Sequence, residues 1–111
     1  MNSNVNSNFI ALDVSYRLIE ALSPIVLVIE RKDRDLADQI RRAATSISLN
    51  LAEGSCSQKG NRHKHFSFAH GSASEVKAGL CVAKAWGWID RSDHALGVLD
   101  RLLALLWKLT H

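Results

Sequence analysis

The chain has 111 residues, enough for one domain with a modest core, and its 47% hydrophobic and 23% charged residues are ordinary for a globular protein. The formal net charge of +3 is mildly basic, weaker than that of a dedicated nucleic-acid-binding domain, and solubility alone could account for it. The two cysteines, Cys56 and Cys81, suggest neither a disulfide framework nor a thiol redox motif.

The start of the sequence, MNSNVNSN, lacks the basic residues and apolar core of a signal peptide. No apolar run approaches the length needed to span a bilayer, and residues 25–29 are far too short. We therefore expect a cytoplasmic protein without a membrane partner.

Four segments carry apolar residues at a helical period, and sparse glycine favours long helices joined by short loops over strands. The predicted helices span residues 9–31, 33–56, 61–86 and 91–109. A flexible tail at residues 1–8 precedes them, and residues 9–111 form one domain. The fold class is all-α, an up-down-up-down antiparallel four-helix bundle.

Pro24 lies inside the first helical segment. Proline removes one backbone hydrogen bond and clashes with the carbonyl four residues earlier, so a kink or a break is expected. The apolar stripe continues in phase across Pro24, which favours a kink within one helix. A new helix with Ser23 as its cap is the alternative.

The last helix carries two adjacent leucine faces, more apolar surface than the core of one bundle needs. The residues assigned to an interface between subunits are Val98, Leu102, Leu105 and Leu109. The first helix has a similar surplus, and exposed apolar surface of this size usually marks an interface. The alternative is a single wide stripe that faces the core.

A polar stripe runs along the second helix beside its apolar face. It consists of Gln39, Arg42, Ser46, Asn50 and Glu53. Buried polar groups need hydrogen-bond partners, and the third helix offers Ser72 and Glu75. We interpret this polar seam as a satisfied network that fixes helix register, in preference to a catalytic site.

Folding the second and third helices back on each other predicts ion pairs at both ends of the seam. Arg42 falls opposite Glu75, and Glu53 falls opposite Arg62 or His65. Close approach of the two backbones is expected at small residues, namely Ala43, Ala44, Ala69, Gly71 and Ala73.

The residues do not form a recognisable metal or catalytic site. Di-iron bundles need a His three residues after a Glu, and no glutamate of this chain has one. His63, His65 and His70 could gather with Cys56 around a soft metal, but His63 and His65 face different directions on a helix. Ser72 lacks the preceding strand and the following glycine of a serine-hydrolase motif. We expect no catalytic residue, no cofactor and no metal.

The pattern QIRRAATSISLNLAEG, followed by HGSASE, resembles the four-helix-bundle family of ribosomal-RNA intervening-sequence proteins. More distantly it resembles the accessory variability determinant proteins of diversity-generating retroelements. The similarity spans about residues 9–108. Its most specific positions are Arg42, Ala43, Ser46, Asn50, Ala52, Glu53, Gly54, Gly71, Ser72 and Glu75. The resemblance implies a ring-like homopentamer without an established catalytic site, and nucleic-acid binding in the retroelement branch.

No acidic residue occurs between Glu53 and Glu75, while several basic residues do. The candidates for contact with nucleic acid are Arg41, Lys59, Arg62 and Lys64. Around a ring this patch would repeat once per subunit and attract a phosphate backbone. The alternative is a solvated turn and helix start.

The sequence thus predicts a non-enzymatic homo-oligomer, a pentamer by resemblance, that binds RNA or DNA without sequence specificity. The alternative is a structural or protein-interaction scaffold that binds no nucleic acid. Neither hypothesis includes a small-molecule substrate.

Overall fold

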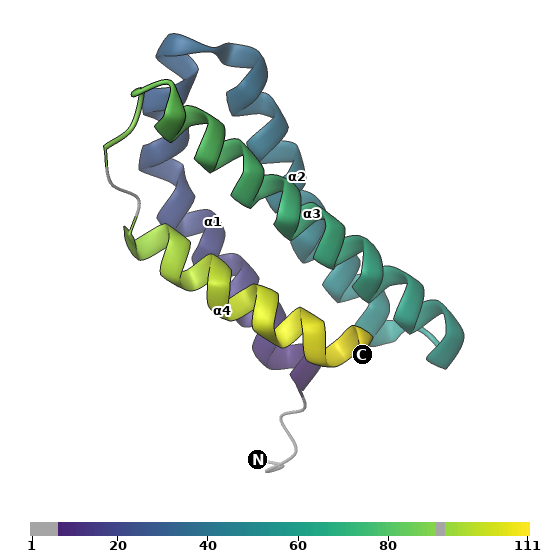
Figure 1. Ribbon diagram of the computed structural model, residues 1–111. Helices are drawn as coiled ribbons and strands as arrows, with labels where there is room; N and C mark the ends of the chain where they lie inside the picture. Colours follow the sequence, from purple (N-terminus) through teal and green to yellow (C-terminus); the bar gives the residue numbers. More distant parts are fainter. Residues whose placement is uncertain (1–6, 91–92) are drawn as a thin grey trace.

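The computed structural model describes residues 7–90 and 93–111, and helices account for most of them (Figure 1). The helices are α1 (Ser7–Lys32), α2 (Arg34–Cys56), α3 (Lys59–Ala85) and α4 (Asp93–Thr110). No strand occurs in the described ranges, so the predicted all-α class with four helices is confirmed. Residues 1–6 lie outside these ranges, so the predicted tail stays a prediction for them. The last two residues assigned to the tail, Ser7 and Asn8, belong to α1.

Each helix packs against two others: α1 and α3 both lie beside α2 and α4. The polar contacts between consecutive helices follow opposite orders along the two helices. Ser48 of α2 meets Ser15 of α1, and His63 of α3 meets Thr110 of α4. Arg41 of α2 meets Glu30 of α1, and Lys77 of α3 meets Asp100 of α4. Consecutive helices therefore run in opposite directions, as Figure 1 also shows. The bundle measures 43 × 25 × 20 Å.

Apolar side chains from all four helices fill one continuous core. The largest fully buried ones are Phe66, Leu18, Ile29, Ile40, Ile47, Leu51, Leu80, Leu99, Leu102 and Leu106. They recur at three- and four-residue spacing along each helix, as expected for helices that share one core. Burial of a side chain of this size contributes about 1.5–3 kcal/mol.

The assignment of Leu102 to a subunit interface is wrong, because its side chain is 0% exposed in the core of the bundle. Val98, Leu105 and Leu109 are half-buried and pack against the same core. Because α1 and α3 flank α4 on both sides, the bundle covers both of its leucine faces. The alternative interpretation, a single wide apolar stripe that faces the core, therefore applies to α4.

The first helix keeps the apolar surplus that its sequence indicates. Tyr16, Ile19, Leu27 and Val28 are all exposed. The helix continues through Pro24 without a break, so the alternative of a new helix at this residue is wrong.

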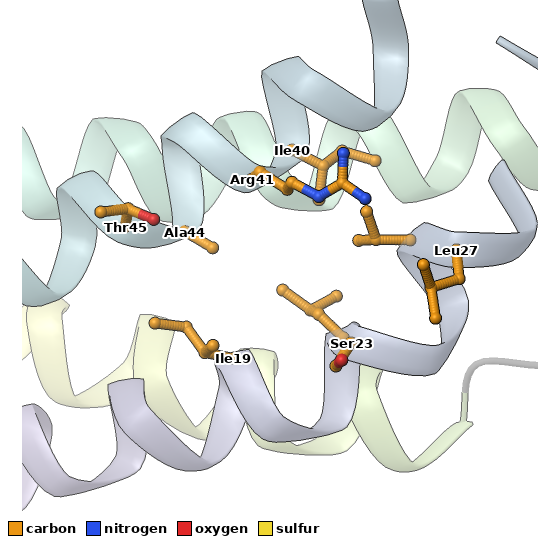
Figure 2. Close-up of a pocket in the computed structure, with 9 residues that line it drawn as sticks. Ile19, Ser23, Leu27, Ile40, Arg41, Ala44 and Thr45 are labelled. Carbon is orange, nitrogen blue, oxygen red and sulfur yellow. The ribbon is translucent and has the colours of Figure 1, made fainter. Parts of the chain in front are cut away.

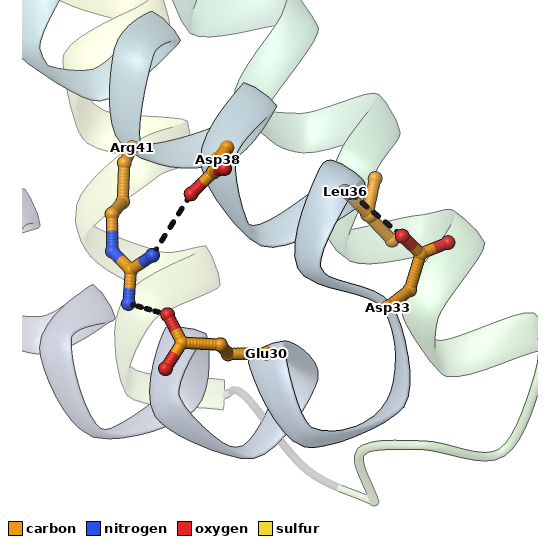
Figure 3. Close-up of polar contacts among 5 residues, drawn as sticks. All are labelled: Glu30, Asp33, Leu36, Asp38 and Arg41. Atoms are coloured by element: carbon orange, nitrogen blue, oxygen red, sulfur yellow. Dashed lines mark hydrogen bonds and ion pairs between the residues drawn. The ribbon is translucent and has the colours of Figure 1, made fainter.

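The second helix begins at a side-chain cap. The carboxylate of Asp33 accepts a hydrogen bond of 3.0 Å from the backbone N–H of Leu36 (Figure 3). This bond satisfies one of the amides that have no partner in the first turn of a helix.

Two glycines let α2 and α3 approach closely. A Cβ atom on Gly54 would lie 2.5 Å from Cε1 of Phe66, and one on Gly79 would lie 2.8 Å from Cγ1 of Ile40. The prediction for Gly71 is wrong, because a Cβ atom there would have no neighbour within 4 Å. Ala69 and Ala73 are fully buried, in agreement with their predicted place between the helices.

Candidate nucleic-acid interface

The middle of the polar seam is a chain of hydrogen bonds between α2 and α3. The hydroxyl of Ser72 donates to Oγ of Ser46 at 3.0 Å. The amide nitrogen of Asn50 donates to the carbonyl and to Oγ of Ser46, at 2.9 and 3.1 Å. The amide oxygen of Asn50 therefore faces His65, whose Nδ1 donates to it at 3.0 Å. The predicted network thus exists at Ser46, Asn50 and Ser72, and it includes His65.

The charged ends of the seam are not paired as predicted. Arg42, Glu53 and Glu75 are exposed, and none of the ion pairs among the described residues joins Arg42 to Glu75 or Glu53 to α3. Asn50 lies on the side of α2 that faces α3. At 3.6 residues per turn, Arg42 and Glu53 lie about 60–80° away from Asn50 around the helix axis, in the direction away from α3. The serine and the asparagine therefore reach the neighbouring helix while these two charged side chains extend into solvent.

A second buried polar contact, absent from the sequence predictions, joins α1 and α2. Oγ of Ser15 donates to the carbonyl of Leu12 at 2.6 Å and accepts from the hydroxyl of Ser48 at 2.8 Å. Both serines are buried, with 1% and 6% of their surface exposed. Single serines among apolar residues carry no periodic signal, so the sequence pattern could not identify this pair.

The start of α3 and the end of α4 meet at one end of the bundle. Nε2 of His63 donates a hydrogen bond of 3.2 Å to the carbonyl of Thr110. In Figure 1 the C-terminus accordingly lies beside the connection between α2 and α3. This contact places the last turn of α4, which carries Lys108, at the same end of the bundle as Arg62 and Lys64. The sequence prediction missed Lys108 because it is remote from α3 along the chain.

We call this region the basic end and define it by Lys59, Arg62, Lys64 and Lys108. Arg62, Lys64 and Lys108 are exposed, whereas the side chain of Lys59 lies outside the described part of the structure. Among the acidic residues nearby, Asp13 pairs with Arg17 at 3.2 Å, which leaves Glu53 as the opposing charge. Among the described side chains at this end, the three basic ones of Arg62, Lys64 and Lys108 outnumber the one opposing carboxylate, Glu53.

Arg41 does not belong to the basic end. Its guanidinium forms ion pairs with Glu30 at 2.7 Å and with Asp38 at 3.1 Å, at the opposite end of the bundle (Figure 3). The hydrogen bond to Glu30 raises the pKa of Arg41 above its ordinary value. Arg41 lies 15 residues before the end of α2 at Cys56, about 22 Å along a helix. The prediction that it joins Lys59, Arg62 and Lys64 is therefore wrong.

An exposed aromatic ring lies next to the basic end on α3. The Phe68 side chain is 53% exposed. Nζ of Lys64 lies 5.9 Å from the centroid of the ring, and the imidazole of His65 meets the ring edge-on at 6.5 Å. His65 is the residue that Asn50 holds in the polar seam, so the seam fixes one neighbour of this ring.

The family model of the 23S rRNA-intervening sequence protein matches residues 9–106. The chain belongs to this family. The match covers most of all four helices, and it confirms the resemblance inferred from the residues of α2 and α3. No curated protein and no solved structure is significantly similar to the chain.

This member of the intervening-sequence family has a shallow groove of about 300 Å³ between α1 and α2 (Figure 2). Its lining is mostly apolar and includes Ile19, Leu22, Val26, Leu27, Ile40 and Ala44. Arg41 lies at its rim, with its charge engaged by the two carboxylates. The groove is thus an apolar surface on the side of the bundle, away from the basic end.

Side chains that could ligate a metal ion are dispersed in the described ranges. No three His, Cys, Asp or Glu side chains there lie close enough together to hold a metal ion. No helix in the same ranges is both long and apolar enough to cross a membrane.

Proposed function

We propose that this intervening-sequence protein is a non-enzymatic homo-oligomer that binds the backbone of nucleic acid through its basic end. The observation that carries the proposal is the excess of basic over acidic side chains at that end. Elsewhere on the bundle, basic groups such as Arg41 and Lys77 are engaged by carboxylates. At the opposite end of the bundle, the exposed cations Arg31, Lys32 and Arg34 alternate along the chain with Asp33 and Asp35. A polyanion therefore meets less repulsion at the basic end.

The charge of one subunit supports weak binding only. Non-specific affinities for nucleic acid are typically about 10⁻⁴–10⁻⁶ M at physiological salt, and each neutralised phosphate contributes about 0.9 to the salt dependence for duplex DNA. Three exposed side chains, Arg62, Lys64 and Lys108, reach solvent at this end. We expect an affinity in the micromolar range at low salt that falls steeply as salt is added.

Homo-oligomerisation is the second part of the proposal, and the α1–α2 groove supports it. Leu27 and Ile19 are 53% and 38% exposed and line this groove, and Tyr16 follows the same stripe of α1. Exposed apolar residues that adjoin an apolar groove are typical of surfaces that pair with another chain. A ring of five copies, which the family resemblance implies, would bury this stripe and repeat the basic end once per subunit.

A non-enzymatic role agrees with the chemistry of the polar groups. Ser46, Asn50, Ser72 and His65 hold one another in hydrogen bonds that link two helices. A nucleophile needs an adjacent base that a third group orients, at the wall of a pocket. Here Ser72 donates to Oγ of Ser46, Ser46 accepts from Ser72 and Asn50, and the imidazole donates to the amide oxygen of Asn50.

The test of nucleic-acid binding compares two triple variants that remove the same charge from opposite ends. Arg62→Ala, Lys64→Ala and Lys108→Ala together remove the exposed cations of the basic end. Arg31→Ala, Lys32→Ala and Lys84→Ala remove three exposed cations elsewhere, so both variants have the same net charge. Each protein is titrated into labelled single- and double-stranded nucleic acid at two salt concentrations.

The proposal predicts that the first triple variant loses most binding and about two to three units of salt slope, while the second keeps both. Equal losses in the two variants would mean that net charge alone attracts the polyanion. Absence of binding by the native chain at low salt would leave the scaffold as the function.

The test of assembly uses light scattering on a sizing column. Several times the chain mass of 12.3 kDa is expected for the native protein. Leu27→Asp places a charge in the α1–α2 groove and should give smaller species, whereas Val82→Asp, at an exposed apolar residue of α3, should not. A native monomer at every concentration would contradict this part of the proposal.

The alternative function is a scaffold that binds other proteins and no nucleic acid. The exposed apolar residues on α1 favour it, because they suit a protein partner as well as a second copy. A scaffold should assemble through the groove and show no salt-dependent affinity for nucleic acid.

A further inference from the structure

We infer that Phe68 is a stacking platform for an unpaired nucleobase, so that the protein prefers single-stranded to double-stranded nucleic acid. This inference rests on the proposed binding at the basic end and adds the class of nucleic acid. Phe68 combines three features that such a platform needs: an accessible ring, an adjacent cation and a fixed position.

The accessible ring is the first feature. Phe68 is 53% exposed on α3, a turn beyond Lys64. Gly71 follows one turn later on the same side of the helix, and a Cβ atom there would have no neighbour within 4 Å. The ring thus has open space on its C-terminal side, where a flat base can approach it.

The adjacent cation is the second feature. Nζ of Lys64 lies 5.9 Å from the ring centroid, at the outer limit of a cation–π contact. Lys64 is exposed, so its ammonium can leave the ring for a phosphate while a base takes its place. Proteins that bind single strands combine basic grooves with aromatic rings in this way, because every base has a face that stacks.

The fixed position is the third feature. His65 meets the edge of Phe68 at an interplanar angle of 84°. Asn50 holds His65 through a 3.0 Å hydrogen bond, and Ser46 holds Asn50. The polar seam therefore orients the imidazole that flanks the ring, and His65 and Asn50 are positioning residues for the platform.

A duplex cannot use this ring in the same way. Its bases are already stacked on one another, and its surface presents phosphates, which Arg62, Lys64 and Lys108 can contact. Binding to a duplex should therefore depend on the cations, while binding to a single strand should depend on the cations and on Phe68.

The experiment compares Phe68→Ala with the native chain, using a labelled single-stranded oligonucleotide and a duplex of the same length at one salt concentration. Loss of one stacked base should lower the single-strand affinity by about 5- to 150-fold and leave the duplex affinity within about twofold. Phe68→Tyr keeps the ring and should bind both as the native chain does. Trp86→Ala removes another exposed aromatic ring, about 27 Å along α3, and should change neither affinity.

A second variant approaches the platform from the open side. Gly71→Glu meets no neighbour in the fold, so it should leave stability intact while it places a carboxylate one turn from Phe68. It should weaken single-strand binding at least as much as Phe68→Ala does.

The outcomes separate this inference from the proposed function. Equal affinities of Phe68→Ala and the native chain, with the basic-end triple variant still defective, would overturn the platform and keep the basic end. Equal loss on single strand and duplex would also overturn it. A change in particle mass for Phe68→Ala would assign the ring to a contact with a second copy of the chain. No binding of either nucleic acid by the native chain would refute both.

Discussion

Replacement of Gly54 by alanine isolates the free-energy cost of bringing α2 and α3 closer than an ordinary side chain allows. The new Cβ atom would lie 2.5 Å and 2.8 Å from two ring carbons of Phe66 and 3.3 Å from Cβ of His65. Phe66 is 2% exposed in the core, so its ring cannot move into solvent. Overpacking of this kind costs about 1–3 kcal/mol, and alanine regains up to about 1 kcal/mol in a helix interior.

Gly71→Ala is the matched control, because it makes the same chemical change inside a helix without a steric neighbour. Helix propensity should stabilise this variant by about 0.5–1 kcal/mol. The propensity gain cancels when the two variants are compared, which leaves the overpacking cost of about 1–3 kcal/mol. For a domain of about this size, that difference separates the two melting temperatures by about 4–24 °C.

The assay is thermal unfolding followed by circular dichroism, at one protein concentration because association shifts the melting temperature. We expect the order Gly71→Ala, native, Gly54→Ala from most to least stable. A Gly54→Ala variant as stable as Gly71→Ala would mean that α2 and α3 do not approach at Gly54.

Two further substitutions test the core and the cap of α2. Leu102→Ala should lower the free energy of unfolding by about 2–5 kcal/mol because the side chain is 0% exposed, and Leu109→Ala should lower it less because Leu109 is half-buried. Small and equal losses for both variants in denaturant melts would mean that Leu102 is not in the core. Asp33→Ala removes the hydrogen bond to the amide of Leu36 and should cost about 0.5–2 kcal/mol, whereas Gln39→Ala, on an exposed site of the same helix, should be nearly neutral in the same melts.

The helices follow from local pattern, and the structure agrees with it closely. Apolar spacing, the scarcity of glycine and the cap at Asp33 are all short-range features, so they determine where α2 begins without knowledge of its neighbours. Helix packing is less local. Leu102 looks like surplus apolar surface when α4 is considered alone, and it becomes core only because α1 and α3 both cover α4.

The candidate site was only partly predictable for the same reason. Ser46, Asn50 and Ser72 were identified because their spacing places them beside the core face. Lys108 was missed, since only the contact between His63 and Thr110 brings the end of α4 to the start of α3. Arg41 was misplaced, because sequence proximity to the seam gives no information about the carboxylate of Glu30 across the loop.

In the proposed oligomer, the positions of the two surfaces would let a weakly charged subunit bind nucleic acid. The α1–α2 groove (Figure 2) lies on the side of the bundle, whereas Arg62, Lys64 and Lys108 lie at the end where α3 begins and α4 ends. Assembly through the groove therefore need not cover the basic end. Copies joined through their sides would hold several basic ends in one particle, and a nucleic-acid strand that engages two of them binds the second at high effective concentration. A net charge of +3 per chain then suffices, because the affinity depends on the number of ends that one strand reaches.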